Sequence, residues 1–400
     1  MPVYWIWFAE LRGIGLLAKR QLLQVFPDPE ELFNAEEKAL RELPAQVRDA
    51  LSDRDLTKAR AILTQCKQLG IKVLTFGDGQ YPENLRNIEE PPLVLYYKGN
   101  LPDWQAQPLI GIVGTRHASS YGLQTAGLLS AQAAVCGAIV VSGVAAGIDS
   151  AAMEAALDAD RPVIGVVGGG VDVIYPAKNR NLYRRTEECG CLISEYPPGT
   201  RPFGGNFLRR NRIISGISQG VLVVEAPERS GALNTAHHAF EQGRDVFTVP
   251  ANLGVASSQG SNALLQEGAY AVFSGWDMVK LYAPLYPDTV ENRPVPAQKK
   301  PAKVAQTPFI PENRVDKTQT PAKNPIDNGK ESTYSVINKR PQGLSDQETA
   351  ILELLGETPQ LTDSIMDASG LPFGTVQSIL TRLAIKGFVK QYPDGSVSRK

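Results

Sequence analysis

The chain has 400 residues, of which 42% are hydrophobic and 21% charged, and its formal net charge is −1 at pH 7. The length predicts two to four domains, and the composition is typical of a soluble globular protein. A net charge near zero excludes nucleic-acid binding driven by the whole chain, so such binding would need a local basic patch.

Membrane, metal and secretory functions find no support in the sequence. No apolar run reaches the roughly 20 residues that span a bilayer, and the first residues lack the features of a signal peptide. The four cysteines, with Cys189 and Cys191 too close for the usual zinc pair, fit a reduced protein. We therefore expect a cytoplasmic protein without membrane contact or bound metal.

Residues 1–68 have apolar positions at helical spacing and predict a helical domain of SAM-like or helix-hairpin-helix-like type. The segment LRGIGLLAKRQLL (11–23) places a Gly-x-Gly turn between two helices. Such a turn can present backbone N–H groups to a phosphate, and it can equally be a plain tight turn. Both interpretations stay open.

Short β-branched strands alternate with helical segments from residue 71 onward. Runs such as LIGIVG (109–114) and PVIGVVGG (162–169) are continuously apolar, which is typical of parallel strands buried on both faces. Eight such strands and six intervening helical segments extend to about residue 285. The alternation predicts an α/β fold over 69–285, with an extended Rossmann-like, doubly wound and mostly parallel sheet.

The remaining chain predicts a linker and a small domain. Residues 286–342 contain nine prolines and ten basic against six acidic residues, a composition that predicts a disordered linker. Residues 343–400 predict three helices, at about 345–355, 361–369 and 372–386, followed by a hairpin. This is a winged helix-turn-helix pattern, but its net charge of −2 favours protein interaction over ordinary duplex binding.

Three strand ends in the α/β region look suited to anions. Gly168, Gly169 and Gly170 follow a buried strand and indicate a close approach to the backbone, but Pro176 blocks the helix that a dinucleotide fingerprint requires. We therefore expect no NAD and no other cofactor. The loop SGVAAGID (142–149) begins with Ser142 and Gly143 and would direct N–H groups at a phosphate, with Asp149 favoured as a helix N-cap.

Arg116 directly follows a third strand, in IGIVGTRHASSYG (110–122), and could contact a ligand or form a surface salt bridge. The strongest charge signal is 178–212, where eight basic and three acidic residues give +5. A basic groove across several strand ends suits a linear polyanion, with Tyr175, Tyr183 and Phe207 available for stacking or for core packing. The contacts predicted in this segment are Lys178, Asn179, Arg180, Arg209, Arg210 and Arg212.

Several motifs, in this order, resemble the DprA (Smf) family of bacterial DNA-processing proteins. They are VGTR (113–116), SGVAAGID (142–149), GGGVDVIYPAKN (168–179), SEYPPG (194–199), RRNRIISG (209–216), VVEAPERSGALNTA (223–236) and GRDVFTVP (243–250). The resemblance implies a protein that is not an enzyme and that binds and protects incoming single-stranded DNA. It further implies that the protein loads RecA recombinase on this DNA during natural transformation.

The resemblance also assigns individual residues. Arg116 inherits a DNA contact, whereas the family's basic residue after Tyr-Pro corresponds to Ala177 here, with Lys178 next. A homodimer is implied through the end of the α/β domain. The residues that correspond to this interface are Asn262, Leu264 and Leu265. The sequence departs from the family pattern in VPANLG (249–254) and GGNFLRRNR (204–212).

Two other functions stay open. A Rossmann-like enzyme acting on a nucleotide monophosphate could use Glu195, Asp172 or Glu225 as acid or base, although no paired carboxylate spacing supports it. A DNA-binding regulator could act through the winged helix, which the −2 charge of that domain opposes.

Overall fold

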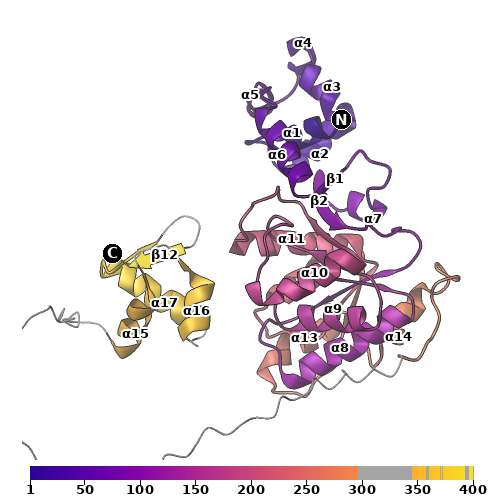
Figure 1. The fold of residues 1–400 in the computed structure, drawn as a ribbon, viewed down its shortest axis with the longest axis vertical. Helices are drawn as coiled ribbons and strands as arrows, with labels where there is room; N and C mark the ends of the chain where they lie inside the picture. Colours follow the sequence, from indigo (N-terminus) through magenta and orange to yellow (C-terminus); the bar gives the residue numbers. More distant parts are fainter. Residues whose placement is uncertain (296–344, 357–359, 370, 372, 392–395, 400) are drawn as a thin grey trace, which may run out of the picture. The chain divides into compact units, whose positions relative to one another are not determined.

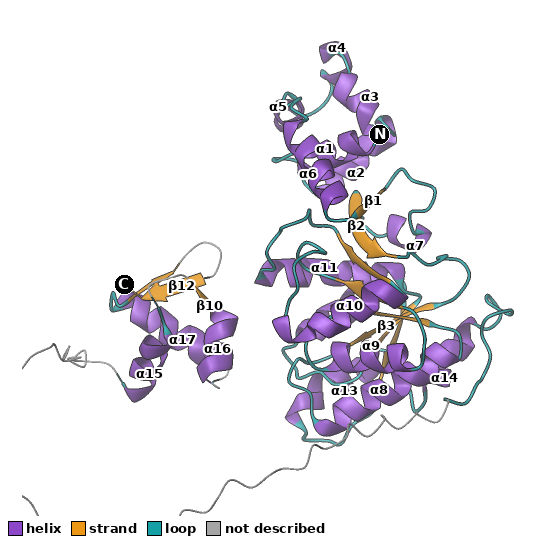
Figure 2. Ribbon diagram, in the orientation of Figure 1, coloured by secondary structure: helices purple, strands orange, loops and turns teal. Residues whose placement is uncertain are grey.

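The computed structural model describes residues 1–295, 345–356, 360–369, 371, 373–391 and 396–399. The chain divides into two compact units, Met1–Gln298 and Lys299–Lys400. The first contains the N-terminal helices and a large α/β sheet, and the second contains a small helical domain with a short sheet (Figures 1 and 2). None of the helices in the described residues combines the length and apolarity that a bilayer crossing needs.

The N-terminal helices pack directly on the α/β part of the first unit. Trp5 and Phe8 on the first helix belong to the same apolar cluster as Val140 and Leu192 of the sheet. The two parts that the sequence divides at residue 68 therefore share one continuous core. The six helices are α1 (Pro2–Glu10), α2 (Leu16–Val25), α3 (Pro29–Asn34), α4 (Glu37–Leu40), α5 (Ala45–Leu51) and α6 (Thr57–Gln68).

The Gly-x-Gly turn between α1 and α2 is closed by the chain itself. Gly13 has φ +83°, a left-handed conformation that glycine adopts without strain. The buried Lys19 donates to the carbonyl oxygens of Ala9 (2.7 Å) and Leu11 (2.9 Å), and the Gln46 amide donates to Gly13 O (3.0 Å). The last carbonyls of α1 and the turn thus have partners within the protein.

A nine-stranded sheet in the order β1-β2-β6-β5-β4-β3-β7-β8-β9 forms the centre of this unit. The seven strands from β6 to β9 in this order are parallel, and β2 pairs antiparallel with both β1 and β6. The strands are β1 (Lys72–Thr75), β2 (Val94–Gly99), β3 (Leu109–Val113), β4 (Ile139–Ser142), β5 (Val163–Val166), β6 (Cys191–Ser194), β7 (Gly220–Val223), β8 (Asp245–Thr248) and β9 (Tyr270–Ala271).

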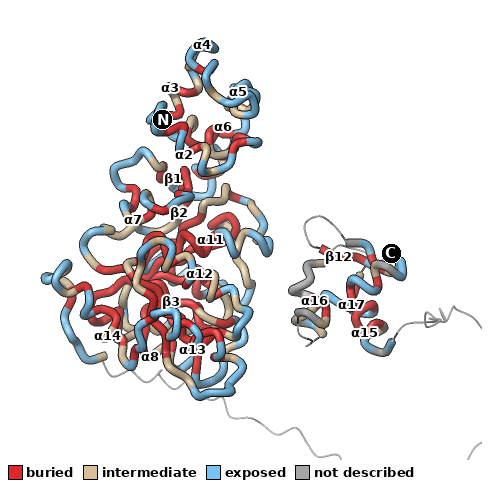
Figure 3. Tube along the Cα trace, turned by 180° about the vertical axis from the view of Figure 1, so that it is seen from behind, coloured by how far each residue is buried: buried red, intermediate tan, exposed pale blue. Residues whose placement is uncertain are grey.

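Helices cover both faces of the sheet, so its central strands β3 to β7 are fully buried (Figure 3). Side chains alternate along β3: Ile110 and Ile112 face one apolar cluster, and Leu109 and Val113 face the other. The first face is covered by α8 (Ser120–Val135), α9 (Ile148–Asp158), α10 (Arg180–Cys189) and α14 (Gly275–Val279). The second is covered by α7 (Glu83–Arg86), α11 (Gly204–Ile217), α12 (Gly231–Glu241) and α13 (Gln259–Gln266).

This architecture confirms the predicted doubly wound, mostly parallel α/β fold. The eight predicted strands correspond to β1 through β8, and the six predicted helical segments to α8 through α13. The helix α11 begins at Gly204, five residues before the predicted start at 209. The short edge strand β9 has two exposed residues, and so it lacks the apolar run that marks the other strands.

The α/β body continues beyond the predicted boundary at residue 285. Tyr286 accepts a hydrogen bond from Gln219 (2.9 Å), Val290 is buried, and Glu291 N donates to Cys136 O (3.2 Å). The prolines and charges of 286–295 suggested a linker, but two apolar side chains are enough to fix this stretch on the sheet. The rest of the predicted linker, 296–342, lies outside the described residues.

The second unit has the predicted winged-helix elements. Its helices are α15 (Asp346–Leu354), α16 (Thr362–Ser369) and α17 (Phe373–Ile385), and β10 (Gln360–Leu361), β12 (Ser396–Arg399) and β11 (Val389–Gln391) form an antiparallel sheet in that order. Ile351, Ile379 and Leu383 form its core with Val397. The turn of the predicted hairpin, between β11 and β12, lies outside the described residues.

Candidate nucleic-acid interface

The predicted contact segments meet at the carboxyl edge of the parallel sheet. Arg116 lies in the loop after β3, Gly143 follows β4, the three glycines follow β5 and Glu195 follows β6. The chain winds from β3 to β6 on one side and from β7 to β9 on the other, so the winding direction reverses between β3 and β7. Open α/β sheets bind their ligands at this point.

Arg116, Phe207 and Tyr175 form a cluster at this edge that we call the platform. The Arg116 Cζ atom lies 4.9 Å from the centroid of the Phe207 ring. The Phe207 and Tyr175 ring centroids are 5.4 Å apart, with an interplanar angle of 32°. Arg116 is exposed and the two rings are half-buried, so a planar group can stack on the exposed parts of the rings next to a cation.

Four further basic residues of the predicted groove are exposed: Lys178, Arg180, Arg201 and Arg209. Arg209 lies two residues after Phe207, and its side chain is 50% exposed. Other basic residues of the +5 segment are paired. Arg184 contacts Glu188 at 2.6 Å and Arg185 contacts Asp158 at 2.7 Å. The positive charge available to a ligand is therefore smaller than the sequence indicates.

Arg212 was predicted as a DNA contact, and the structure places it inside the protein. Its Nη1 donates to Glu195 Oε1 (3.0 Å) and its Nη2 to Glu195 Oε2 (2.7 Å), and 6% of the side chain is exposed. A guanidinium that a carboxylate binds at both ends and that solvent hardly reaches is not available to a phosphate. Arg212 thus fixes α11 to the end of β6, and this placement does not favour the predicted DNA contact.

Arg210 is a second predicted contact that is buried, with 4% of its surface exposed. Its Nη1 donates to Val166 O at the end of β5, and a Cβ atom at Gly143 would overlap its guanidinium. Burial raises the pKa of the nearby Asp149, although Arg210 and the N–H groups of Ala145 and Gly143 favour its ionised form. Gly143 N donates to Asp149 Oδ2 (3.0 Å), so arginine, loop and carboxylate form an internal polar network.

The three glycines do mark a close approach, but the approaching groups belong to this chain. A Cβ at Gly168 would lie 2.9 Å from the Phe207 ring, and one at Gly169 would lie 2.8 Å from Thr200 O. Gly170 N donates to Thr200 O (2.9 Å), which holds the 197–202 loop over the glycines. All three glycines are buried beneath this loop and Phe207, and a direct DNA contact at them stays a prediction.

Ser142 and Asn179 also have structural roles. Ser142 is fully buried and donates to Ile112 O (2.6 Å). Asn179, 7% exposed, donates to Val144 O (2.9 Å) and so ties the start of α10 to the loop after β4. Both were predicted as DNA contacts, and both are inaccessible for the same reason: polar groups beside parallel strands serve to satisfy buried backbone groups.

The carboxylates considered for an enzyme are occupied. Glu195 binds Arg212, Asp172 accepts from Gly199 N (3.0 Å), and the buried Glu225 accepts from Ser119 N and Oγ (3.0 Å each). In the part of the chain that the structure describes, no group of histidine, cysteine and acidic residues could hold a metal ion. None of these three carboxylates is therefore placed as a general acid or base with a second catalytic group beside it.

The residues predicted at a dimer interface differ in exposure. Leu264 is 1% exposed and belongs to the core, so it cannot meet a partner. The Asn262 side chain binds Ala251 on both sides, accepting from its N–H and donating to its carbonyl (3.0 Å each). Leu265 is half-buried. The large apolar side chains exposed on either side of it along the chain are Leu253 (93% exposed), Val255 (42%), Tyr270 (54%) and Phe273 (80%).

The fold and site define a Rossmann-like α/β protein with an attached winged helix, and comparison with known proteins gives its family. Residues 72–283 match the family described as DNA recombination-mediator protein A, and residues 338–395 match the DprA winged helix domain. The chain belongs to this family, as the motif resemblance predicts.

Individual relatives agree over most of the chain. Protein Smf of Synechocystis sp. is 33% identical over 99% of this chain and 98% of its own length. DNA processing protein DprA of Bacillus subtilis is 41% identical over 55% of this chain and 74% of its own. The X-ray structure of DNA processing protein A from Streptococcus pneumoniae superposes with a TM-score of 0.60 at 33% identity, covering 70% of this chain and 98% of that one.

Proposed function

We propose that the protein binds single-stranded DNA at the platform and acts as a recombination mediator rather than as an enzyme. The observation that carries this proposal is the stacking of the Arg116 guanidinium on Phe207 beside Tyr175, at the winding reversal of the sheet. Partly exposed aromatic rings next to cations bind bases through their faces and phosphates through charge. Bases stack on protein rings in this way only when they are unpaired, so the geometry favours single strands over duplexes.

The proposed role includes protection of incoming single-stranded DNA and loading of RecA recombinase on it during natural transformation. Membership of the recombination-mediator family supports this role. The engagement of Glu195, Asp172 and Glu225 in internal hydrogen bonds supports a binding function over nucleotide chemistry. We propose that it acts in the cytoplasm as a homodimer, with Leu265 and the exposed apolar side chains around β9 at the interface.

The experiment compares fluorescence anisotropy of a labelled oligothymidylate with that of a duplex of equal length, over a series of salt concentrations. We expect tighter binding of the single strand, affinity that falls steeply with salt, and a large loss in Arg116→Ala. Equal affinity for both DNA forms would contradict the proposal. Loading is tested separately, as the rate at which RecA hydrolyses ATP on single strands coated with single-strand-binding protein, with and without this chain.

A further inference from the structure

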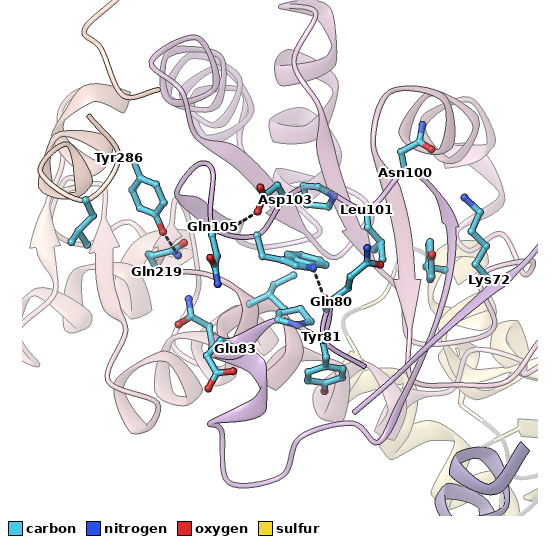
Figure 4. A pocket seen from close by; sticks show the side chains of 18 residues that line it. Lys72, Gln80, Tyr81, Glu83, Asn100, Leu101, Asp103, Gln105, Gln219 and Tyr286 are labelled. Carbon is cyan, nitrogen blue, oxygen red and sulfur yellow. Dashed lines mark hydrogen bonds between the residues drawn. The ribbon is translucent and has the colours of Figure 1, made fainter. Parts of the chain in front are cut away.

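A cavity of about 1160 Å³ opens beside the sheet (Figure 4). It lies at the amino end of the parallel strand β7, since Gln219, which directly precedes β7, is in its lining, whereas the platform lies at the carboxyl ends of the strands. Lys72, the first residue of the antiparallel edge strand β1, lines the cavity as well. The rest of its lining comes from residues 79–84, Tyr97, residues 100–105, Ile217, Leu285 and Tyr286. Small-molecule pockets measure about 300–1,000 Å³, so an open groove of this size suits a segment of a polymer.

Aromatic and aliphatic side chains provide part of the groove surface. Tyr97 and Trp104 are half-buried in the lining, and Leu285 is 72% exposed at its border. The Trp104 Nε1 donates to Gln80 O (3.0 Å), which fixes the indole in place. Because the indole is already fixed, it loses little conformational entropy when a ligand binds against its face.

Four side-chain amides surround these rings: Gln80, Asn84, Asn100 and Gln105. Among the described residues, none of these amide groups has a hydrogen-bond partner, whereas the neighbouring Gln219 amide binds Tyr286 and Leu109 N. A side-chain amide presents a donor and an acceptor side by side, the same pair that a peptide group presents. Several free amides along a groove therefore match the backbone of an extended peptide.

The charges of the groove decide which polymer fits. The Asp103 carboxylate accepts from Gln105 N (3.0 Å) and has no basic partner among the described residues. Glu83 is partly neutralised by Arg86 at 3.4 Å. Lys72 is turned toward its own strand pair, with Nζ 3.4 Å from Gly99 O and 5.6 Å from the Tyr97 ring centroid. Two carboxylates at the border repel phosphates and attract a cation, which disfavours nucleic acid.

We propose that this groove binds an extended peptide segment of a partner protein, with a basic side chain placed against Asp103. The amides would pair with the peptide backbone, and Trp104, Tyr97 and Leu285 would contact its apolar side chains. The site lies at the sheet edge away from the platform, so it is independent of the proposed DNA site and can be occupied while the platform holds DNA.

The test uses short random peptides displayed on phage, selected against the full chain, with synthetic copies of the enriched peptides titrated by calorimetry. We expect enriched sequences to carry a lysine or arginine, and Asp103→Asn and Asn100→Ala each to weaken binding by about tenfold or more. Asp288→Ala removes a nearby exposed carboxylate that does not line the groove, and it should leave the affinity unchanged.

The outcomes separate clearly. No enrichment over an unrelated protein, enrichment of acidic peptides, or binding that both groove variants leave unchanged would each overturn the proposal. Because Asp103 and Asn100 are exposed, their substitution should not unfold the protein, and circular dichroism checks this. Binding of oligothymidylate by the same variants should equal that of the parent chain, so failure of this proposal is distinguishable from failure of the DNA-binding proposal.

Discussion

The guanidinium of Arg212 and the carboxylate of Glu195 form a two-point ion pair, with Nη1 to Oε1 at 3.0 Å and Nη2 to Oε2 at 2.7 Å, in which 6% and 9% of the two side chains are exposed. Three residues earlier on the same helix, Arg209 is 50% exposed and lies 3.8 Å from the same carboxylate. Two arginines thus lie near the same carboxylate: Arg212 is buried and structural, whereas Arg209 is accessible to solvent and to a ligand.

The ion pair predicts a stability effect. Removing one partner of a buried pair leaves an uncompensated charge, so we expect Glu195→Gln to lower the free energy of unfolding by about 3–5 kcal/mol. Urea denaturation followed by circular dichroism measures this. Glu188→Gln is the matched control, because its pair with Arg184 is exposed and should contribute no more than about 1 kcal/mol. Similar effects of both substitutions would show that the buried Glu195–Arg212 pair stabilises the fold no more than an exposed pair does.

Neighbouring arginines on α11 should behave in opposite ways. We expect Arg209→Ala to keep the melting temperature of the parent while it weakens single-strand binding and lowers the salt slope by about 0.7, the value for one phosphate contact. Arg210→Ala should instead lower the melting temperature, because it removes the guanidinium that binds Val166 O and faces Asp149. Differential scanning calorimetry and anisotropy titrations distinguish the two. If Arg210→Ala keeps the melting temperature of the parent and binds DNA more weakly, then Arg210 contacts DNA and the prediction is wrong.

The platform predicts a specific role for one ring. Stacking of a base on an aromatic side chain contributes about 1–3 kcal/mol, so Phe207→Ala should weaken binding of oligothymidylate by about fivefold or more. Phe207→Tyr keeps a ring and should restore most of the affinity. Leu128→Ala, which removes a 55% exposed apolar side chain from α8, serves as control in the same anisotropy assay. If Phe207→Ala binds as tightly as the control, the ring packs in the fold without contacting DNA.

The two adjacent leucines of α13 give a test of the proposed dimer. Leu265→Glu places a charge on a half-buried position and should give monomers that still fold. Leu264→Glu would bury that charge in the core and should unfold the domain. Sedimentation velocity and circular dichroism report the two outcomes. A folded Leu265→Glu dimer would place the interface elsewhere.

The winged helix carries a pH prediction. Hydrogen bonds from Lys386, then from Ser345 N and Arg382, lower the pKa of Glu348 to about 2 from its ordinary 4.5. The folded state therefore prefers the ionised carboxylate, so this stabilisation is complete above pH 4.5 and is lost as the pH falls toward about 2. The protection of α15 and α17 amides, taken as the ratio of the intrinsic to the observed hydrogen–deuterium exchange rate at each pH, should fall across this window in the parent chain. In Glu348→Gln the protection should already be low at pH 6 and should change less between pH 4.5 and 2.

That same contact bears on duplex binding by the winged helix. Arg382 and Lys386, two of the basic residues on the predicted recognition helix, both lie against Glu348, at 3.3 and 2.8 Å. Their charge is partly compensated within the domain, in agreement with the interpretation drawn from its net charge of −2.

Apolar periodicity was enough to predict the architecture, because every parallel strand except β9 is a short apolar run and helical segments alternate with these runs along the chain. The exposure of individual arginines was harder to predict, although the spacing of apolar residues on α11 indicated part of it. Arg210 occurs three, four and seven residues before Ile213, Ile214 and Ile217, so it shares their core-facing stripe on α11. Its charge suggested the surface, and only tertiary contacts with Val166 and Asp149 make its burial possible.

The glycines show a second limit of sequence reasoning. A glycine indicates that some group comes close to the backbone, but it does not say whether that group is a ligand or another part of the chain. Here the groups close to Gly168 and Gly169 are Phe207 and Thr200, which lie more than 30 residues later and reach these glycines only through the fold. Sequence spacing carries no information about such a long-range contact.

The position of Phe207 against Gly168 has a consequence for the energetics of recognition. The ring rests on the glycine backbone on one side and meets the Arg116 guanidinium on another, so folding has already fixed its rotamer. Immobilising a free side chain at an interface costs about 0.5–1.5 kcal/mol of conformational entropy, and a base that stacks on this ring does not incur that cost. By leaving room for the ring, Gly168 thereby makes the aromatic surface rigid before the proposed ligand binds.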